Sequence, residues 1–452
     1  MHVLLAASSL SATLTKAAQF ILSLSIIIVW HELGHFLPAK WFKCRVEKFM
    51  LFFDAGFSLF KKKIGETVYG IGWLPLGGYV KISGMIDESM DKEALKLPPQ
   101  PWEFRSKPAW QRLIIMAGGV TMNVILAFFL FAVILQVWGD QYLAPQNTTY
   151  GLYADSLGQK IGLRTGDKIM SIDGKPVKDE SKVVLDIFTH EAKHIQVDRN
   201  GALIDLAIPD EFIGELSHNR LDGFAEVTFP TIVDSVKSAQ IKQGTLQRGD
   251  RIISIAGIST PDFMTFTHAR SQFKKETVDL GLIRAGDTVH ILATLDSNGA
   301  VGFLANTRLD SLLHLTTVKY GFFESFPAGV RKSIDVMSNY IAQLKLLFTN
   351  KHVKSQDSLG SVITIGNAYA PVWDWESLWR LTAFLSVILG FMNILPIPAL
   401  DGGHILFLLV EMVTGRKPGD KFLEYAQIGG MVLLLGLMAY ALGLDVFRLF
   451  RH

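Results

Sequence analysis

The chain has 452 residues, of which 49% are hydrophobic and only 19% are charged, and its formal net charge is +2. This length allows two or three domains. The apolar residues concentrate in a few long segments, which indicates a membrane protein with an additional soluble portion. The small net charge argues against a nucleic-acid partner. A single cysteine, Cys44, excludes both an internal disulfide and a cysteine-cluster zinc site.

Four uncharged apolar segments approach the length needed to cross about 30 Å of hydrocarbon. They cover residues 17–30, 113–139, 381–400 and 425–444. The first has the position of a signal peptide, but no basic region leads into it and no small-residue cleavage site follows it. We therefore expect a polytopic α-helical membrane protein with four spanning helices.

Basic residues indicate how these helices are oriented, because Lys and Arg accumulate in short cytoplasmic loops. The loop at 38–109 is rich in them, and the loop after the third span carries Arg416, Lys417 and Lys421. Placing both loops in the cytoplasm puts the N-terminus, the long middle region and the C-terminus outside the cytoplasm. Arg448 and Arg451 oppose this orientation, but the two loops carry the heavier bias.

The middle region contains an internal duplication. Residues 163–174 and 246–257 share the pattern Leu-x-x-Gly-Asp-x-Ile-x-Ser-Ile-x-Gly. Gly-Asp is typical of a tight turn, and the alternation that follows is typical of a half-buried strand. The pattern resembles PDZ domains, which bind extended peptides by adding a strand to a sheet edge. Two β-rich PDZ-like domains are therefore expected between spans two and three, either as peptide binders or as spacers and steric gates.

Residues after the second repeat return to a helical pattern. Apolar residues recur there at helical spacing, including Phe322, Phe326 and Val330. The pattern predicts a helix that packs against the second repeat or lies on the membrane surface.

The clearest chemical motif is His31-Glu32-Leu33-Gly34-His35, at the end of the first span. On a helix the two histidines lie one turn apart and face the same way, so both imidazoles can bind one zinc ion. Glu32 can reach a water beside that metal and suits the role of general base. HExxH arises by chance in many helices, but ionisable residues at the end of an apolar span are costly and indicate function.

A catalytic zinc ion normally needs a third protein ligand. Asp401 follows Pro396 and Pro398, which interrupt the third span. Irregular backbone at membrane depth is tolerated only inside protein or beside a wet cavity. Asp401 is therefore the expected ligand, and His404 is its weaker rival. Three carboxylates closer to the motif lack such a context: Glu47, Asp54 and Glu66.

Taken together, these features resemble the site-2 protease family, most closely its bacterial envelope-stress branch, which cleaves a membrane-embedded anti-sigma factor. The resemblance rests on HELGH, on Asn-x-x-Pro-x-Pro-x-Leu-Asp-Gly at 393–402 and on the tandem repeats, and it covers nearly the whole chain. Residues 73–81 resemble the family's membrane-re-entrant β-hairpin region. Residues 117–123 resemble its Gly-x-x-x-Asn element, with Val120 at the usual proline position.

The resemblance implies a zinc metalloendopeptidase in which Zn²⁺ has two histidine ligands and one aspartate ligand, with a glutamate as general base. By position in this sequence these are His31, His35, Asp401 and Glu32. It also implies that further residues orient the substrate or groups around the metal: Asn123, Asn393, Gly77 and Gly78.

The resemblance also implies a location and a substrate class. The protein would lie in the bacterial inner membrane, with its active site toward the cytoplasmic side. It would cut transmembrane segments of single-span proteins, an anti-sigma factor or remnant signal peptides, after another protease has shortened them. Two alternatives remain: a membrane-bound PDZ scaffold without proteolysis, and a membrane-anchored zinc enzyme that acts on soluble peptides.

These expectations divide the chain into nine parts. They are the first spanning helix with HExxH (1–38), a cytoplasmic and re-entrant β-hairpin region (39–109), the second spanning helix (110–139), PDZ-like domains 1 (140–222) and 2 (223–308), a helical region (309–377), the third spanning helix with the Leu-Asp-Gly motif (378–403), a cytoplasmic loop (404–424) and the fourth spanning helix (425–447).

Overall fold

The structure is a computed structural model that describes residues 2–75, 77–85, 98–219, 221–236, 241–243, 246–307, 312–353 and 362–451. The chain forms two compact units. A helical unit comprises Met1–Gly139, Lys319–Ile341 and Leu359–His452, and a β-rich unit comprises Asp140–Val318 and Ala342–Ser358.

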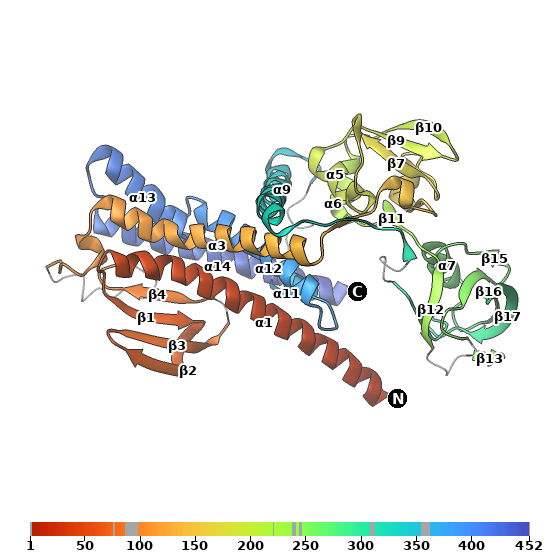
Figure 1. The fold of residues 1–452 in the computed structure, drawn as a ribbon, viewed down its shortest axis with the longest axis horizontal. Coiled ribbons are helices and arrows are strands. Elements are labelled where there is room, and N and C mark those ends of the chain that lie inside the picture. The colour runs from red at the N-terminus through yellow and green to blue at the C-terminus, as the bar shows by residue number, and fades with distance from the viewer. Residues whose placement is uncertain are drawn as a thin grey trace. The chain divides into compact units, whose positions relative to one another are not determined.

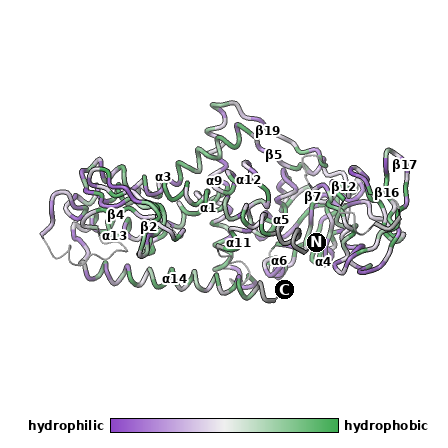
Figure 2. The backbone as a smooth tube through the Cα atoms, turned by 90° about the horizontal axis from the view of Figure 1, so that it is seen from below, coloured by the Kyte–Doolittle hydropathy of each residue, from purple (hydrophilic) through white to green (hydrophobic). Residues whose placement is uncertain are grey.

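Four helices of the helical unit are long and apolar enough to span a membrane, as expected from the sequence. They are α1 (His2–Trp41), α3 (Ala109–Val137), α12 (Trp375–Ile394) and α14 (Asp420–Arg451). The apolar windows within α1 and α14 are Leu10–Trp41 and Lys421–Phe447. Hydrophobic residues follow one another along α14 in Figure 2. Because α1 is one uninterrupted helix, HELGH lies within it and not in a loop after it.

Helices α1, α3 and α12 pack side by side (Figure 1). Ile27 of α1, Leu130 of α3 and Ala383 of α12 belong to one buried apolar cluster. Two glycines allow α1 and α3 to touch through their backbones. A Cβ added at Gly34 would lie 2.2 Å from the Gly118 carbonyl oxygen. The glycine inside HELGH therefore permits the close approach that brings α3 over the two histidines.

The segment between α12 and the next helix, α13 (Asp401–Thr414), is not helical. The two prolines expected to interrupt the span lie here, and α12 ends at Ile394. Gly402 and Gly403 pack tightly against this turn, since an added Cβ at Gly402 would lie 2.2 Å from the Leu395 carbonyl oxygen. The expected loop at 404–424 is helical as far as Thr414, because the apolar run after Asp401 starts a new helix.

A four-stranded sheet packs beside α1. Its strands are β1 (Val46–Leu51), β2 (Phe53–Ile64), β3 (Thr67–Leu74) and β4 (Tyr79–Ile82), in the order β2-β3-β1-β4. Strand β1 pairs in parallel with β3 and antiparallel with β4. Because β1 separates β3 from β4, the residues at 77–78 form a connection across the sheet and not the tip of a hairpin. The paired hairpin is β2–β3, which turns at 65–66.

The duplicated motif occupies equivalent places in the β-rich unit. Its first copy forms β7 (Lys168–Ile172) and its second forms β14 (Arg251–Ile255). Each strand is followed by a short helix, α5 (Val183–His190) or α7 (Phe263–Arg270), and then by an antiparallel strand pair. These pairs are β9 (His194–Arg199) with β10 (Ala202–Ala207), and β16 (Thr277–Arg284) with β17 (Asp287–Thr294).

The Asp of each Gly-Asp turn has the same role in both copies. Asp167 and Asp250 are each 1% exposed. Arg199 donates to Asp167 at 2.7 Å through both Nε and Nη2, and Arg284 donates to Asp250 at 2.8 and 2.7 Å. The repeat seen in the sequence is therefore a repeat of a buried ion pair as well as of strands.

The chain enters and leaves these repeats through two paired strands. Strand β5 (Asp140–Tyr142) pairs antiparallel with β19 (Thr316–Val318). Helix α9 (Phe322–Thr349) follows, and Leu346 near its end is buried in the core of the first repeat. The expectation that this helix packs against the second repeat or on the membrane surface was thus wrong for its last turns. Helical spacing identifies an apolar face but not the surface that covers it.

Candidate metal centre

Two imidazoles of α1 point to one place between α1 and α3. The Nε2 atoms of His31 and His35 are 3.3 Å apart, and both residues are buried. His35 Nδ1 lies 2.9 Å from the Ile115 carbonyl oxygen. A carbonyl only accepts, so Nδ1 carries the proton and donates it. This leaves the Nε2 lone pair directed toward His31, as in a metal-binding histidine.

The second imidazole is held from α3 by Asn123. His31 Nδ1 lies 3.2 Å from the Asn123 side-chain nitrogen, and Asn123 is fully buried. Among the described residues, none gives Asn123 Oδ1 a hydrogen bond. Amide oxygen and nitrogen positions are assigned from the network around them. Exchanging the two atoms lets His31 Nδ1–H donate to Oδ1, which satisfies the buried oxygen and turns His31 Nε2 toward the metal side.

Asp401 completes a triangle with the two histidines. Its Oδ2 atom lies 3.3 Å from His31 Nε2 and 3.4 Å from His35 Nε2. Nitrogen and oxygen ligands placed about 2.0–2.1 Å from a tetrahedral zinc ion are separated by about 3.3 Å. The three contacts therefore have the edge length of a zinc tetrahedron, with one corner left for another ligand. Asp401 Oδ2 is buried, and no described residue satisfies it by a hydrogen bond, as expected of a metal ligand.

Within the described part of the chain, these three residues form the group of His, Cys, Asp and Glu side chains whose ligand atoms lie within 4.8 Å of one another. His404, the rival for the third position, lies one helical turn beyond Asp401 and is not in this group. The beginning of α13, directly after the broken span, is what brings Asp401 to the histidines.

A glycine of α3 leaves the space that the imidazoles need. A Cβ added at Gly119 would lie 2.4 Å from His35 Nε2 and 2.6 Å from His31 Cε1. Real Cβ atoms do not approach other heavy atoms this closely, so any other residue would displace one or both rings. In the sequence this glycine stands out only as the first residue of the Gly-x-x-x-Asn element within 117–123.

The triangle opens into a cavity of about 580 Å³. Glu32 lines it and is 8% exposed, and Asn393 lines it from the end of α12. Gly78 also lines it, and a Cβ there would lie 2.5 Å from Ile28 Cγ2. Gly77 instead lies beside the Phe53 ring and does not line the cavity. Of the four further residues that the resemblance implied, Asn123, Asn393 and Gly78 therefore adjoin the metal group or its cavity.

Sequence reasoning missed a polar cluster on the sheet side of this cavity. Tyr79 Oη donates to Asp54 Oδ1 at 2.8 Å, and Lys48 Nζ lies 3.8 Å from Asp54 Oδ2. Burial alone would raise the pKa of Asp54, but the hydrogen bond from Tyr79 and the charge of Lys48 lower it below its ordinary value. The three residues come from different strands, so only knowledge of the strand order could have brought them together.

Comparison with known proteins places nearly the whole chain in one family. The model of peptidase family M50 matches residues 19–437. A protein of Treponema pallidum named "Putative zinc metalloprotease" is 26% identical over 446 residues, covering 94% of this chain and 98% of that protein. Proteins with the same description in Fusobacterium nucleatum and Campylobacter jejuni are 29% and 28% identical. They align over 95% of this chain and over 98% and 92% of their own lengths.

Proposed function

The chain belongs to peptidase family M50, the site-2 protease family, and is a zinc metalloprotease of the membrane; we propose that it hydrolyses a peptide bond within the transmembrane segment of single-span proteins. The observation that carries this proposal is the His31–His35–Asp401 triangle, whose edges fit zinc and whose histidines lie within a membrane-spanning helix.

We assign zinc ligation to His31, His35 and Asp401, and the general base to Glu32. Zinc, when bound, polarises the scissile carbonyl and makes water a stronger acid. Glu32 lines the same cavity, so it can take the proton of the attacking water and return it to the leaving amine. Asn123 orients His31, and the Ile115 carbonyl orients His35.

Replacing Gly119 by alanine is expected to weaken zinc binding by about 10- to 100-fold, because the new methyl group would push both imidazoles out of position. Zinc content of the purified full-length protein measures this. Gly436→Ala on α14 is the matched control, since an added Cβ there meets nothing within 4 Å. Equal zinc content in the two variants would contradict the assigned site.

The substrate must be partly unwound before it is cut, and a sheet edge offers its backbone new hydrogen bonds. Strand β4 is the edge strand that begins just after Gly78, and Tyr79, Val80, Lys81 and Ile82 all line the metal cavity. We propose that the scissile segment pairs with this edge. This refines the expected role of Gly77 and Gly78: they lead the chain into the strand that offers the edge.

Lys81→Pro is expected to reduce cleavage of a transmembrane substrate by about tenfold, because proline breaks the regular backbone hydrogen bonding of β4 and so distorts the edge that the strand offers. Lys81→Ala keeps the backbone N–H of the strand and controls for the lost side chain. Lys62→Pro makes the same change on β2, the opposite edge of the sheet. Equal cleavage by the Lys81→Pro and Lys62→Pro variants, with both proteins folded, would exclude pairing at β4.

We propose that the hairpin β2–β3 enters the membrane. Phe57, Leu59, Phe60 and Trp73 are each more than one-third exposed. Three consecutive lysines at 61–63 precede the turn, where long basic side chains can reach a polar interface. A re-entrant hairpin of this kind would place the sheet, and β4 with it, at the depth of the substrate.

We also propose that the two repeats are PDZ domains that restrict access. The duplicated strands and their Asp–Arg pairs support two domains of one kind. Deleting residues 152–310 leaves the β5–β19 ladder as the junction. The shortened protein is expected to cleave a full-length substrate that the intact protein cuts only after ectodomain trimming. Continued dependence on trimming in an SDS-gel cleavage assay would contradict a gate.

The finer biological assignment follows from the sequence resemblance. We propose a bacterial inner-membrane protein whose N-terminus, repeats and C-terminus are extracytoplasmic and whose metal lies toward the cytoplasmic side. The basic loops at 38–109 and after α13 support this orientation. An anti-sigma factor, or remnant signal peptides, would then be the substrates.

A further inference from the structure

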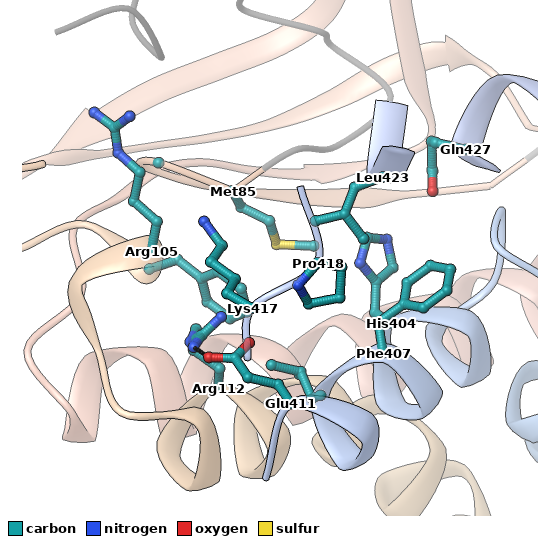
Figure 3. Close-up of a pocket in the computed structure, with 13 residues that line it drawn as sticks. Met85, Arg105, Arg112, His404, Phe407, Glu411, Lys417, Pro418, Leu423 and Gln427 are labelled. Carbon is teal, nitrogen blue, oxygen red and sulfur yellow. Dashed lines mark hydrogen bonds and ion pairs between the residues drawn. The ribbon is translucent and has the colours of Figure 1, made fainter. Parts of the chain in front are cut away.

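A buried amide on the last spanning helix lines the metal cavity. Gln427 of α14 is 8% exposed, and it borders that cavity together with Glu32 and Asp401. It also lines a second cavity of about 100 Å³ (Figure 3). In that view Gln427 lies next to Leu423, on the side away from Arg105. Because both cavities share this side chain, it lies where the two adjoin.

A glycine one turn further along α14 sets this position. Gly430 is buried three residues after Gln427, on the same face of the helix. A Cβ added at Gly430 would lie 2.7 Å from the Ala399 backbone nitrogen and 3.2 Å from Ala399 Cβ. Helix α14 therefore closely approaches the turn that leads to Asp401, which keeps Gln427 at the metal cavity.

No described residue gives the amide of Gln427 a hydrogen bond. Gln427 nevertheless lies within the apolar window Lys421–Phe447 of a spanning helix. A carboxamide buried there without a partner is costly, and polar side chains inside spanning helices mark functional sites. Within the described part of the chain, the amide is therefore left to bond with what enters the cavity, which is water or substrate.

A second amide in the spanning helices shows what a structural role looks like. Gln19 of α1 is fully buried. Its Nε2 atom donates to the Ala370 carbonyl oxygen at 2.8 Å, and its Oε1 atom accepts from the Asp374 backbone N–H at 3.5 Å. Gln19 thus joins α1 to the segment that leads into α12. Gln427 has no such bonds to the described residues, so helix packing does not account for its amide.

An unwound substrate has main-chain hydrogen-bonding groups on both of its edges. Pairing with β4 satisfies one edge. The groups of the other edge face away from the sheet, and burying them without partners is costly. A carboxamide has one acceptor and two donors, so it can bond to both kinds of main-chain group. Gln427 comes from a helix outside the sheet and lines the same cavity as β4, so it can serve this second edge.

We propose that Gln427 binds the main chain of the unwound substrate at the edge that β4 leaves unpaired. This inference rests on the proposed function and on pairing of the substrate with β4. The main chain is the same in every substrate, so this contact favours no particular span sequence. Gln427 is not in the group of metal ligands, so replacing it should leave zinc content unchanged.

Gln427→Met tests the contact, because methionine keeps the length of the side chain and lacks the amide. In proteoliposomes, the KM for a single-span substrate is expected to rise by about three- to tenfold, because one main-chain hydrogen bond is lost, while kcat stays within about twofold. The rise should be similar for two substrates with unrelated span sequences. Tyr425→Phe is the matched control. It removes a polar group from the exposed face of the same helix and should keep the wild-type KM.

Thermal unfolding of the same purified proteins separates this role from a structural one. Gln427→Met is expected to melt at the wild-type temperature or above, because it loses no hydrogen bond to a described residue. Gln19→Met should melt about 2–4 °C lower, because it loses its bonds to Ala370 and Asp374.

Three results would overturn the role of Gln427: an unchanged KM, a rise in KM confined to one of the two substrates, or a fall in melting temperature as large as that of Gln19→Met. Each leaves the proposed function standing as long as the wild-type protein cuts both substrates. If the wild-type protein cut neither substrate, the proposed function itself would fail, and this inference with it.

Discussion

Glu32→Gln is expected to lower the rate of peptide-bond hydrolysis by about 100- to 10,000-fold while leaving zinc binding intact, because a general base contributes that much. Glutamine keeps the shape of the side chain but cannot accept the proton of the attacking water. Glu32 is not in the triangle of metal ligands, so the Glu32→Gln protein should still bind zinc. Cleavage of a single-span substrate in proteoliposomes, with zinc content measured on the same sample, checks both parts.

Glu66→Gln is the control for this experiment, because Glu66 is exposed at the β2–β3 turn and away from the metal cavity. It should cleave at the wild-type rate. Wild-type cleavage by Glu32→Gln would refute the role of Glu32. Loss of zinc from that variant would instead make Glu32 part of the metal site.

Asp401→Asn is expected to remove zinc from the purified protein. The neutral amide replaces the anionic corner of the triangle, so the loss should exceed the roughly 10- to 100-fold that follows removal of an outer-shell partner. His404→Gln should retain zinc, because His404 lies outside the triangle. The zinc content of the Asp401→Asn and His404→Gln variants is measured by inductively coupled plasma mass spectrometry at a fixed concentration of competing chelator.

Asp445→Asn is the matched control for Asp401→Asn. Asp445 is another buried aspartate of the helical unit, and it accepts a hydrogen bond from Thr364 at 2.7 Å. Asparagine can still accept that bond, so zinc content should not change. If His404→Gln lost zinc and Asp401→Asn kept it, the third ligand would have been assigned to the wrong residue.

Local sequence patterns predicted the parts of this site that are local in space. His31 and His35 are one turn apart on a helix, so their spacing alone brings their rings together. Asp401 is far away in sequence, but the proline-broken span before it marked it as a special carboxylate. The four apolar helices followed from segment length and composition.

Features that depend on long-range packing could not be read in the same way. The place of Asp54 in the cavity depends on the strand order β2-β3-β1-β4, which no periodicity encodes. For the same reason, residues 77–78 were expected at a hairpin and lie in a connection across the sheet. The contact of Leu346 with the first repeat depends on which of two similar apolar cores lies nearer in the fold.

The most direct test of an intramembrane zinc protease is to map the cut. The purified protein and a single-span substrate with a shortened ectodomain are reconstituted in liposomes, and the products are identified by mass spectrometry. The experiment is repeated after zinc removal and after zinc is restored. The proposed function predicts a cut inside the apolar span that disappears without zinc and returns with it. A cut confined to residues outside the span, or one that persists without zinc, would contradict it.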